Sequence, residues 1–126
     1  MSDVAAAVIA LGHARAVLDG DHAVPARHVA RLAAALARQA LEEAVEAVGI
    51  GAMREASMRV RLIGLRVDDR TAVVAADAAL AWRGLSRACH HHSYELAPTV
   101  DEVGHLIDQV AALIPVAYDA AARVTR

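Results

Sequence analysis

The chain has 126 residues, a length that fits one domain with its own core and is too short for two. Hydrophobic residues make up 57% of it, much of that alanine, while aromatic residues make up only 2% and Phe is absent. Alanine is the strongest helix former, and alternating β-branched stretches are scarce, which argues against a sheet protein. The composition therefore predicts an all-α domain over residues 1–126, and the helical segments given below predict a compact up-and-down bundle of four to five helices.

The formal net charge is −2 and all 13 basic residues are Arg. This balance excludes a strongly basic nucleic-acid coat, so contact with RNA or DNA would have to come from a local cluster. The single cysteine, Cys89, excludes an intramolecular disulfide and fits a reducing compartment. Met1-Ser2-Asp3 lacks a signal-peptide pattern, and the longest apolar stretch, 71–82, is shorter than the roughly 20 residues that cross a bilayer. We expect a cytoplasmic protein that does not enter the membrane.

Apolar spacing and turn residues divide the chain into five helical segments. Turn residues close the first segment at 19–21 and the second at 49–51. The predicted helices are Asp3–Leu18, Pro25–Val48, Met53–Val67, Arg70 into the histidines at 90–92, and Thr99–Arg126.

The second predicted helix carries apolar residues at three- and four-residue spacing, which is typical of an amphipathic helix. Arg38 and Glu42, four residues apart, are expected on its outer face. The stripe consists of Val29, Leu32, Leu36, Ala40, Val45 and Val48.

The fourth predicted helix is apolar on nearly all sides between Thr71 and Trp82, a pattern typical of a helix at the centre of a bundle. Asp68 and Asp69 precede it and are expected to cap its first N–H groups.

The last predicted helix begins with a capping box, in which the Thr99 hydroxyl and the Glu102 carboxylate satisfy end N–H groups reciprocally. Pro115 is expected to kink or end the regular helix. Two apolar rows run along this helix. Either both rows belong to the core, or their combined face is wide enough for part of it to form a dimer interface. The rows are Val103, Leu106, Val110, Leu113 and Ala117, and beside them Ile107 and Ile114.

Reactive side chains concentrate between Arg83 and Tyr94, where a buried helix ends. Three consecutive histidines on a helix point about 100° apart and cannot share one ion, and no zinc-type ligand spacing is present, so we predict no metal and no other cofactor. A Cys–His nucleophile has only adjacency to support it, since a Cys in an apolar helix is usually a small buried hydrophobe. Two interpretations remain for the Arg and His residues. They either cap the carbonyls at the helix end or act on a phosphodiester.

The phosphodiester interpretation rests on chemistry and on a resemblance. Arg binds phosphate with two parallel hydrogen bonds, and His transfers protons near neutral pH. The order Arg87, four residues, His92, one residue, Tyr94 resembles the motif of the HEPN superfamily, the higher-eukaryote and prokaryote nucleotide-binding domains. In that family the Arg and His lie near the end of a helical bundle with a final helix after them, which residues 99–126 would supply.

The resemblance implies a homodimer whose two motifs face each other across a cleft. It implies a metal-independent endoribonuclease acting on RNA, with Arg87 and His92 as catalytic residues. Many such proteins are toxins paired with a small nucleotidyltransferase antitoxin, which can attach AMP to the motif Tyr, here Tyr94. One position departs from the family, because Ala88 stands where a polar residue is typical. The alternative is therefore a catalytically inactive HEPN-like module for dimerisation or binding.

Helical geometry sets a condition on this motif. On an unbroken helix Arg87 shares a face with Arg83 and His91, whereas His92 lies about 140° around. For Arg87 and His92 to act together, the helix must unwind near His91 or a partner subunit must complete the site. Arg83, His91 and Tyr94 are the supporting candidates.

Overall fold

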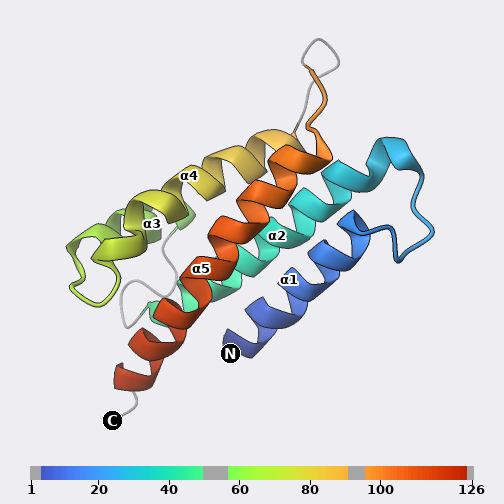
Figure 1. Cartoon of the computed structure of the whole chain (residues 1–126). Helices are drawn as coiled ribbons and strands as arrows, with labels where there is room; N and C mark the ends of the chain where they lie inside the picture. The colour runs from blue at the N-terminus through green and yellow to red at the C-terminus, as the bar shows by residue number, and fades with distance from the viewer. Residues whose placement is uncertain (1–3, 50–56, 91–95, 125–126) are drawn as a thin grey trace.

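The computed structural model describes residues 4–49, 57–90 and 96–124, and Figure 1 shows their arrangement. The four long helices lie side by side, each running opposite to the next along the chain, and the short α3 packs against α4. The described residues contain helices and no strand, which confirms the predicted all-α bundle. The helices are α1 (Val4–Leu18), α2 (Ala26–Val48), α3 (Met58–Val67), α4 (Ala72–Cys89) and α5 (Val100–Val124).

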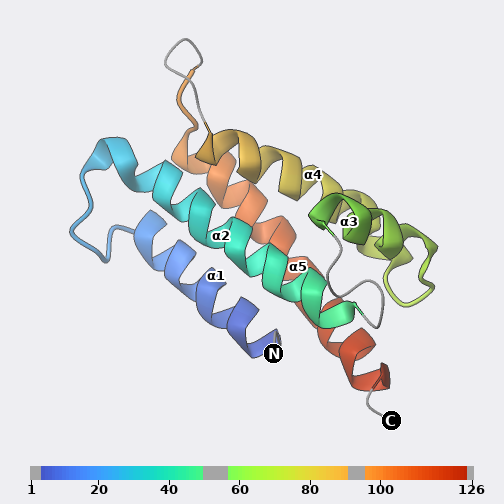
Figure 2. The same ribbon diagram turned by 180° about the vertical axis from the view of Figure 1, so that it is seen from behind.

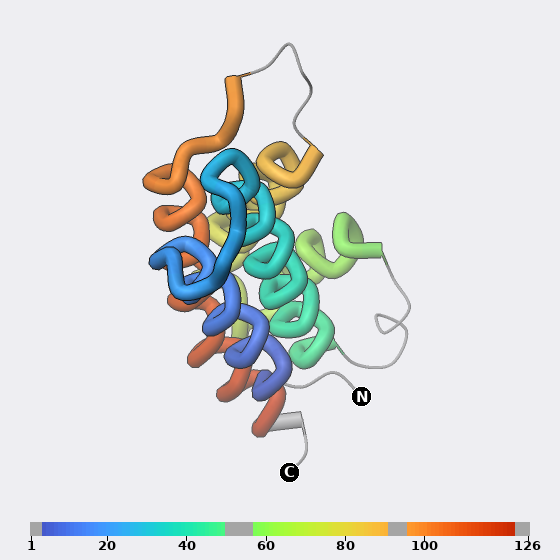
Figure 3. The backbone as a smooth tube through the Cα atoms, turned by 90° about the vertical axis from the view of Figure 1, so that its right-hand side faces the viewer, coloured from blue at the N-terminus to red at the C-terminus, as the bar shows by residue number. Residues whose placement is uncertain are grey.

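The central helix is α2, which contacts α1, α3, α4 and α5, and Figure 3 shows it in the middle of the bundle. Its buried side is mainly alanine, whose small side chain lets neighbouring helices approach closely. The predicted stripe was therefore partly wrong, since Leu32 is exposed and Leu36 only half-buried. The buried residues of α2 are Ala33, Ala34, Ala37, Ala40, Leu41, Ala44, Val45 and Val48.

The prediction that the fourth helix lies at the centre is wrong. α4 buries one face against α2 and α5 and leaves Val73 and Leu80 exposed on another. Alanine on several faces made the helix look uniformly apolar, although alanine buries little area and tolerates water easily.

The start of α4 differs from the expected cap. Thr71 is the N-cap of α4, and its side chain makes no cap hydrogen bond to the new helix. Its buried hydroxyl donates instead to the carbonyl of Leu65 in α3, at 2.9 Å. Asp68 and Asp69 were expected to cap α4, but its N-cap is Thr71, and the Asp68 carboxylate accepts from the Arg70 backbone and side chain in the turn before the helix.

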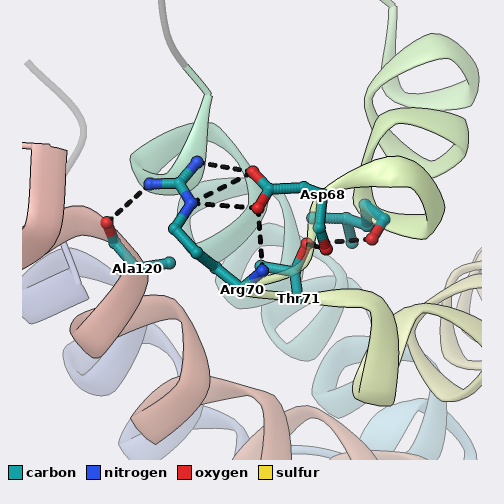
Figure 4. A network of polar contacts seen from close by, with 5 residues as sticks. Asp68, Arg70, Thr71 and Ala120 are labelled. Carbon is teal, nitrogen blue, oxygen red and sulfur yellow. Dashed lines mark hydrogen bonds and ion pairs between the residues drawn. The ribbon is translucent and has the colours of Figure 1, made fainter.

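Arg70 ties this turn to the last helix, as Figure 4 shows. Its guanidinium is paired with Asp68, and Nη1 donates to the carbonyl of Ala120 in α5, at 2.8 Å. The hydrogen bond from Arg70 holds the pKa of Asp68 below its usual value, although partial burial opposes the shift.

The start of α5 agrees with its sequence signal. The Glu102 N–H donates to the Thr99 hydroxyl at 3.0 Å, and the Thr99 N–H donates to the Glu102 carboxylate at 3.4 Å, which confirms the capping box. Pro115 was expected to kink or end the regular helix. It does not end α5, which continues to Val124.

Figure 2 shows from behind that α1 and α3 lie at opposite edges of the bundle. Within the described ranges, no helix combines the length and apolar character needed to cross a membrane.

Candidate functional site

The reactive segment covers the last turns of α4 and the residues that follow the helix end. Cys89 is the last residue of α4, and His90 caps it with φ −108° and ψ 33°, its N–H donating to the Ser86 carbonyl at 3.1 Å. His91, His92 and Tyr94 lie outside the described residues. α4 therefore ends before His91, which is the condition that the sequence set for Arg87 and His92 to act together.

Arg87 lies on the last turn of α4 with its side chain exposed. It lines a cavity of about 560 Å³ between the end of α4 and the start of α5, which we call the α4–α5 cavity. Among the described residues, Arg87 has no hydrogen-bond or ion-pair partner. The cavity is lined by Gly84, Arg87, Ala88, Leu96, Pro98, Asp101, Glu102, Val103, His105 and Leu106.

Gly84 lies against Leu106 of α5 beside this cavity. A Cβ atom at Gly84 would lie 2.9 Å from Cδ2 of Leu106, closer than two carbon atoms pack. The contact is with the end of the leucine side chain, so a larger residue at position 84 would require Leu106 to move.

The electrostatics of the α4–α5 cavity differ from one wall to the other. Arg87 supplies positive charge on the α4 side, while Asp101 and Glu102 come from the first turn of α5. An anion would therefore be attracted to the α4 wall and repelled by the α5 wall. The remaining surface is mainly apolar, contributed by residues such as Leu96 and Val103.

Two arginines of α2 hold the last turns of α4, which sequence reasoning missed. The guanidinium carbon of Arg38 lies 4.3 Å from the centroid of the Trp82 ring, and its Nε donates to the Ser86 hydroxyl at 3.1 Å. Arg31, seven residues earlier on α2, donates from Nε to the Cys89 carbonyl at 3.0 Å. The expected outer-face position of Arg38 is therefore wrong. The seven-residue spacing of these two arginines, two helical turns, was the available signal.

Arg83 does not line the same cavity as Arg87. It lies one turn earlier, also exposed, and borders a separate groove of about 520 Å³ between α3 and α4. The two arginines are one turn apart on α4, and the structure places each of them beside a different hollow. This α3–α4 groove is lined by Arg59, Leu62, Ile63, Arg66, Ala79, Trp82, Arg83 and Ser86.

Cys89 is half-buried, and burial raises the pKa of its thiol, although Arg38 and Arg31 act in the opposite direction. A raised pKa leaves less of the reactive thiolate near neutral pH, so the geometry disfavours Cys89 as a nucleophile. Within the described part of the chain, no three His, Cys, Asp or Glu side chains are grouped as metal ligands.

No family model matches the sequence, and comparison with curated proteins and with solved structures finds no match. Over residues 4–49, 57–90 and 96–124 the fold is an all-α bundle of five helices, and the last turn of α4 carries Arg87.

Proposed function

We propose that the chain is a metal-independent endoribonuclease of the HEPN type, with Arg87 and His92 as its catalytic pair. The observation that supports this most directly is the end of α4 at Cys89, which leaves Arg87 exposed on the last turn beside the α4–α5 cavity. His92 follows three residues after the helix end in the sequence, so the helical rule that separates the two side chains by about 140° does not apply across that end.

The proposed reaction uses the substrate's own hydroxyl as nucleophile. His92 accepts the proton of a ribose 2′-hydroxyl, and the 2′-oxygen attacks the adjacent phosphorus. The bond to the 5′-oxygen breaks, that oxygen takes up a proton from water, and a 2′,3′-cyclic phosphate remains. Arg87 stabilises the additional negative charge on the phosphate oxygens, for which its planar donors are suited. Because Asp101 and Glu102 line the opposite wall, the phosphate belongs on the α4 side of the cavity.

A homodimer is part of the proposal, and the exposed face of α4 supports it. Val73, Leu80 and Arg87 follow one another at seven-residue spacing, which keeps them on one stripe of a helix. Val73 is 84% exposed and Leu80 52% exposed. A second copy packed on this stripe about a two-fold axis parallel to α4 would bring the two Arg87 side chains together, as facing motifs require.

The same proposal gives roles to the supporting residues. His91 would assist at the phosphate, and Tyr94 would contact the substrate or accept AMP from a nucleotidyltransferase antitoxin. Arg83, one turn before Arg87 and beside the separate α3–α4 groove, would contribute to RNA binding and not to the reaction.

A catalytically inactive binding module is the second candidate, and two observations favour it. Ala88 is buried and offers no polar group, and among the described residues nothing orients the Arg87 guanidinium. A catalytic Arg is normally held in place by its surroundings. Such a module would bind RNA without cleaving it.

The experiment that tests the nuclease is cleavage of a single-stranded RNA in the presence of EDTA by the wild-type chain and its Arg87→Ala and His92→Ala variants. We expect cleavage by the wild type, a loss of at least about 100-fold in each variant, and cyclic phosphate ends on the products. Arg15→Ala, on α1, is the control for removing one positive charge. Equal activity of all four proteins would contradict the assignment of Arg87 and His92, and no cleavage by the wild type would favour the binding module.

A further inference from the structure

The α3–α4 groove gathers positive charge in a chain that carries a net negative charge. Three arginines border it, Arg59 and Arg66 from α3 and Arg83 from α4, and all three side chains are exposed. None of the residues that line the groove is acidic, and among the described residues no ion pair neutralises any of these three arginines. Three arginines on one groove whose lining has no carboxylate indicate a surface suited to an anionic ligand.

The comparison with Arg61 on the same helix sharpens this point. Arg61 faces Glu46 of α2 at 4.0 Å and lies outside the groove. α3 therefore directs one arginine toward a carboxylate of the bundle and two others toward the groove. The charge in the groove is a property of this face and not of α3 as a whole.

Apolar and aromatic surface lies between these charges. Trp82, Leu62 and Ile63 line the groove together with the arginines. Arg38 lies against the Trp82 ring and bonds to Ser86, so the indole is held in place by a contact from the bundle side. A rigid aromatic side chain amid cationic ones is the combination by which proteins bind single-stranded nucleic acids, with bases packed on the ring and phosphates on the cations.

The spacing of the arginines fits a strand better than a free nucleotide. Arg59 and Arg66 are seven residues apart on α3, which separates their Cα atoms by about 10 Å along the helix. The phosphates of a free nucleotide are clustered at one end, whereas those of a strand recur at regular intervals. The volume of about 520 Å³ suffices for a few groups of a strand in an open groove.

We propose that the α3–α4 groove binds single-stranded RNA, with Arg59, Arg66 and Arg83 on its phosphates and Trp82 under a base. The choice of RNA over other single strands rests on the proposed function, whereas the strand-binding chemistry rests on the groove. The groove is separate from the α4–α5 cavity, so the strand would be held at one place and cleaved at another.

The test uses the full chain and a fluorescein-labelled oligouridine of about 12 nucleotides, with binding followed by fluorescence anisotropy. Arg59→Ala, Arg66→Ala and Arg83→Ala are each expected to weaken binding by about fivefold or more. Arg15→Ala, which removes an equal charge from α1, is expected to bind as the wild type does. Circular dichroism of each variant checks that the exposed substitutions leave the helices intact.

The salt dependence supplies a second measure. Each phosphate contact to a single strand contributes about 0.7 to the slope of log K against log salt concentration, so the triple variant should lose about 2 from that slope. The measurement runs from about 50 to 200 mM salt, where such slopes are resolved.

Intrinsic fluorescence reports on the groove without any substitution, because Trp82 is the only tryptophan in the chain. Unlabelled oligouridine should quench its emission over the same concentration range as the anisotropy change. Unchanged Trp82 emission on saturation would overturn the proposed base contact. Wild-type affinity and slope in the triple variant, or competition by uridine monophosphate at the concentration of the oligomer, would overturn the strand-binding groove.

Failure of the groove and failure of the nuclease give different results. If the wild type binds RNA through these arginines but does not cleave it, the result supports the binding groove and contradicts the proposed reaction. If the wild type cleaves RNA and the triple variant cleaves with the same KM, the result supports the reaction and contradicts the binding groove. His92→Ala separates the two directly, since it should lose cleavage and keep both anisotropy and quenching.

Discussion

Arg38 and Trp82 stack across the interface of α2 and α4, with the guanidinium carbon 4.3 Å from the ring centroid. The same guanidinium bonds to the Ser86 hydroxyl, one turn further along α4. One side chain of the central helix thus contacts two residues of α4 that line the α3–α4 groove. The contact links the packing of the bundle to that groove.

Arg38→Met should lower the free energy of unfolding by about 1–2 kcal/mol, because it removes both the cation–π contact and the charged hydrogen bond while keeping the length of the side chain. Urea unfolding followed by circular dichroism measures the change. Arg15→Met is the matched control, since Arg15 pairs with Asp108 at 3.1 Å on a half-exposed surface, where such pairs contribute less than about 1 kcal/mol. A loss no larger in Arg38→Met than in Arg15→Met would show that the stacked contact does not stabilise the fold.

Asp68 gives the stability of the α3–α4 turn a defined pH dependence. Its pKa is lowered in the folded chain, chiefly by the hydrogen bond from Arg70. A carboxyl with a lowered folded pKa stabilises the fold fully above its unfolded pKa of about 3.9 and loses that contribution as the pH falls through the folded value.

The expected result is a stability difference between wild type and Asp68→Asn that is constant from about pH 7 to 5 and shrinks below about pH 4. Urea unfolding at a series of pH values measures it. Asp119→Asn, an exposed position on α5, is the control for removing one negative charge. A difference that grows as the pH falls would have the wrong sign and would exclude the Asp68–Arg70 pair as its source.

Local signals in the sequence predicted several helix ends closely, although α3 begins at Met58, five residues after its predicted start. The capping box of Thr99 and Glu102 depends on residues three apart, so it can be read without knowing the fold. The turn at 19–21 is similar, because Gly20 adopts a φ of +83° that favours glycine. These signals depend only on near neighbours in the chain.

The arrangement of the helices could not be obtained in the same way. Alanine occurs on several faces of α4, so periodicity did not reveal that Val73 and Leu80 face outward. The position of Arg38 depends on a tryptophan 44 residues away in the sequence, which no local pattern records. Long arginine side chains also cover apolar surface while their charge stays hydrated, so a polar residue need not mark an outer face.

The candidate site shows the same division between local and tertiary information. Arg83 and Arg87 are one turn apart and look equivalent on α4, and the sequence grouped them together. The structure places α3 beside one and α5 beside the other, so that they border separate hollows. The sequence predicted that the fourth helix runs into the histidines at 90–92, whereas in the structure α4 ends at Cys89.

Leu80→Glu should prevent dimerisation if a second copy covers the stripe of Val73, Leu80 and Arg87. The substitution puts a charge at the centre of that face, where burial without a partner would cost several kcal/mol in the dimer and almost nothing in the monomer. Light scattering coupled to size-exclusion chromatography should show the wild type at twice the chain mass of 13.2 kDa and the variant at the mass of one chain.

Val8→Glu is the matched control, because Val8 on α1 is also 52% exposed and equally apolar but lies on a different helix. If Val8→Glu remains dimeric and Leu80→Glu does not, the interface follows α4 and the two Arg87 side chains are neighbours. RNA cleavage should then fall in Leu80→Glu together with dimer content and recover at higher protein concentration, since an intact Arg87 and His92 remain in each chain. A monomeric wild type that cleaves RNA would show instead that one chain carries the complete site.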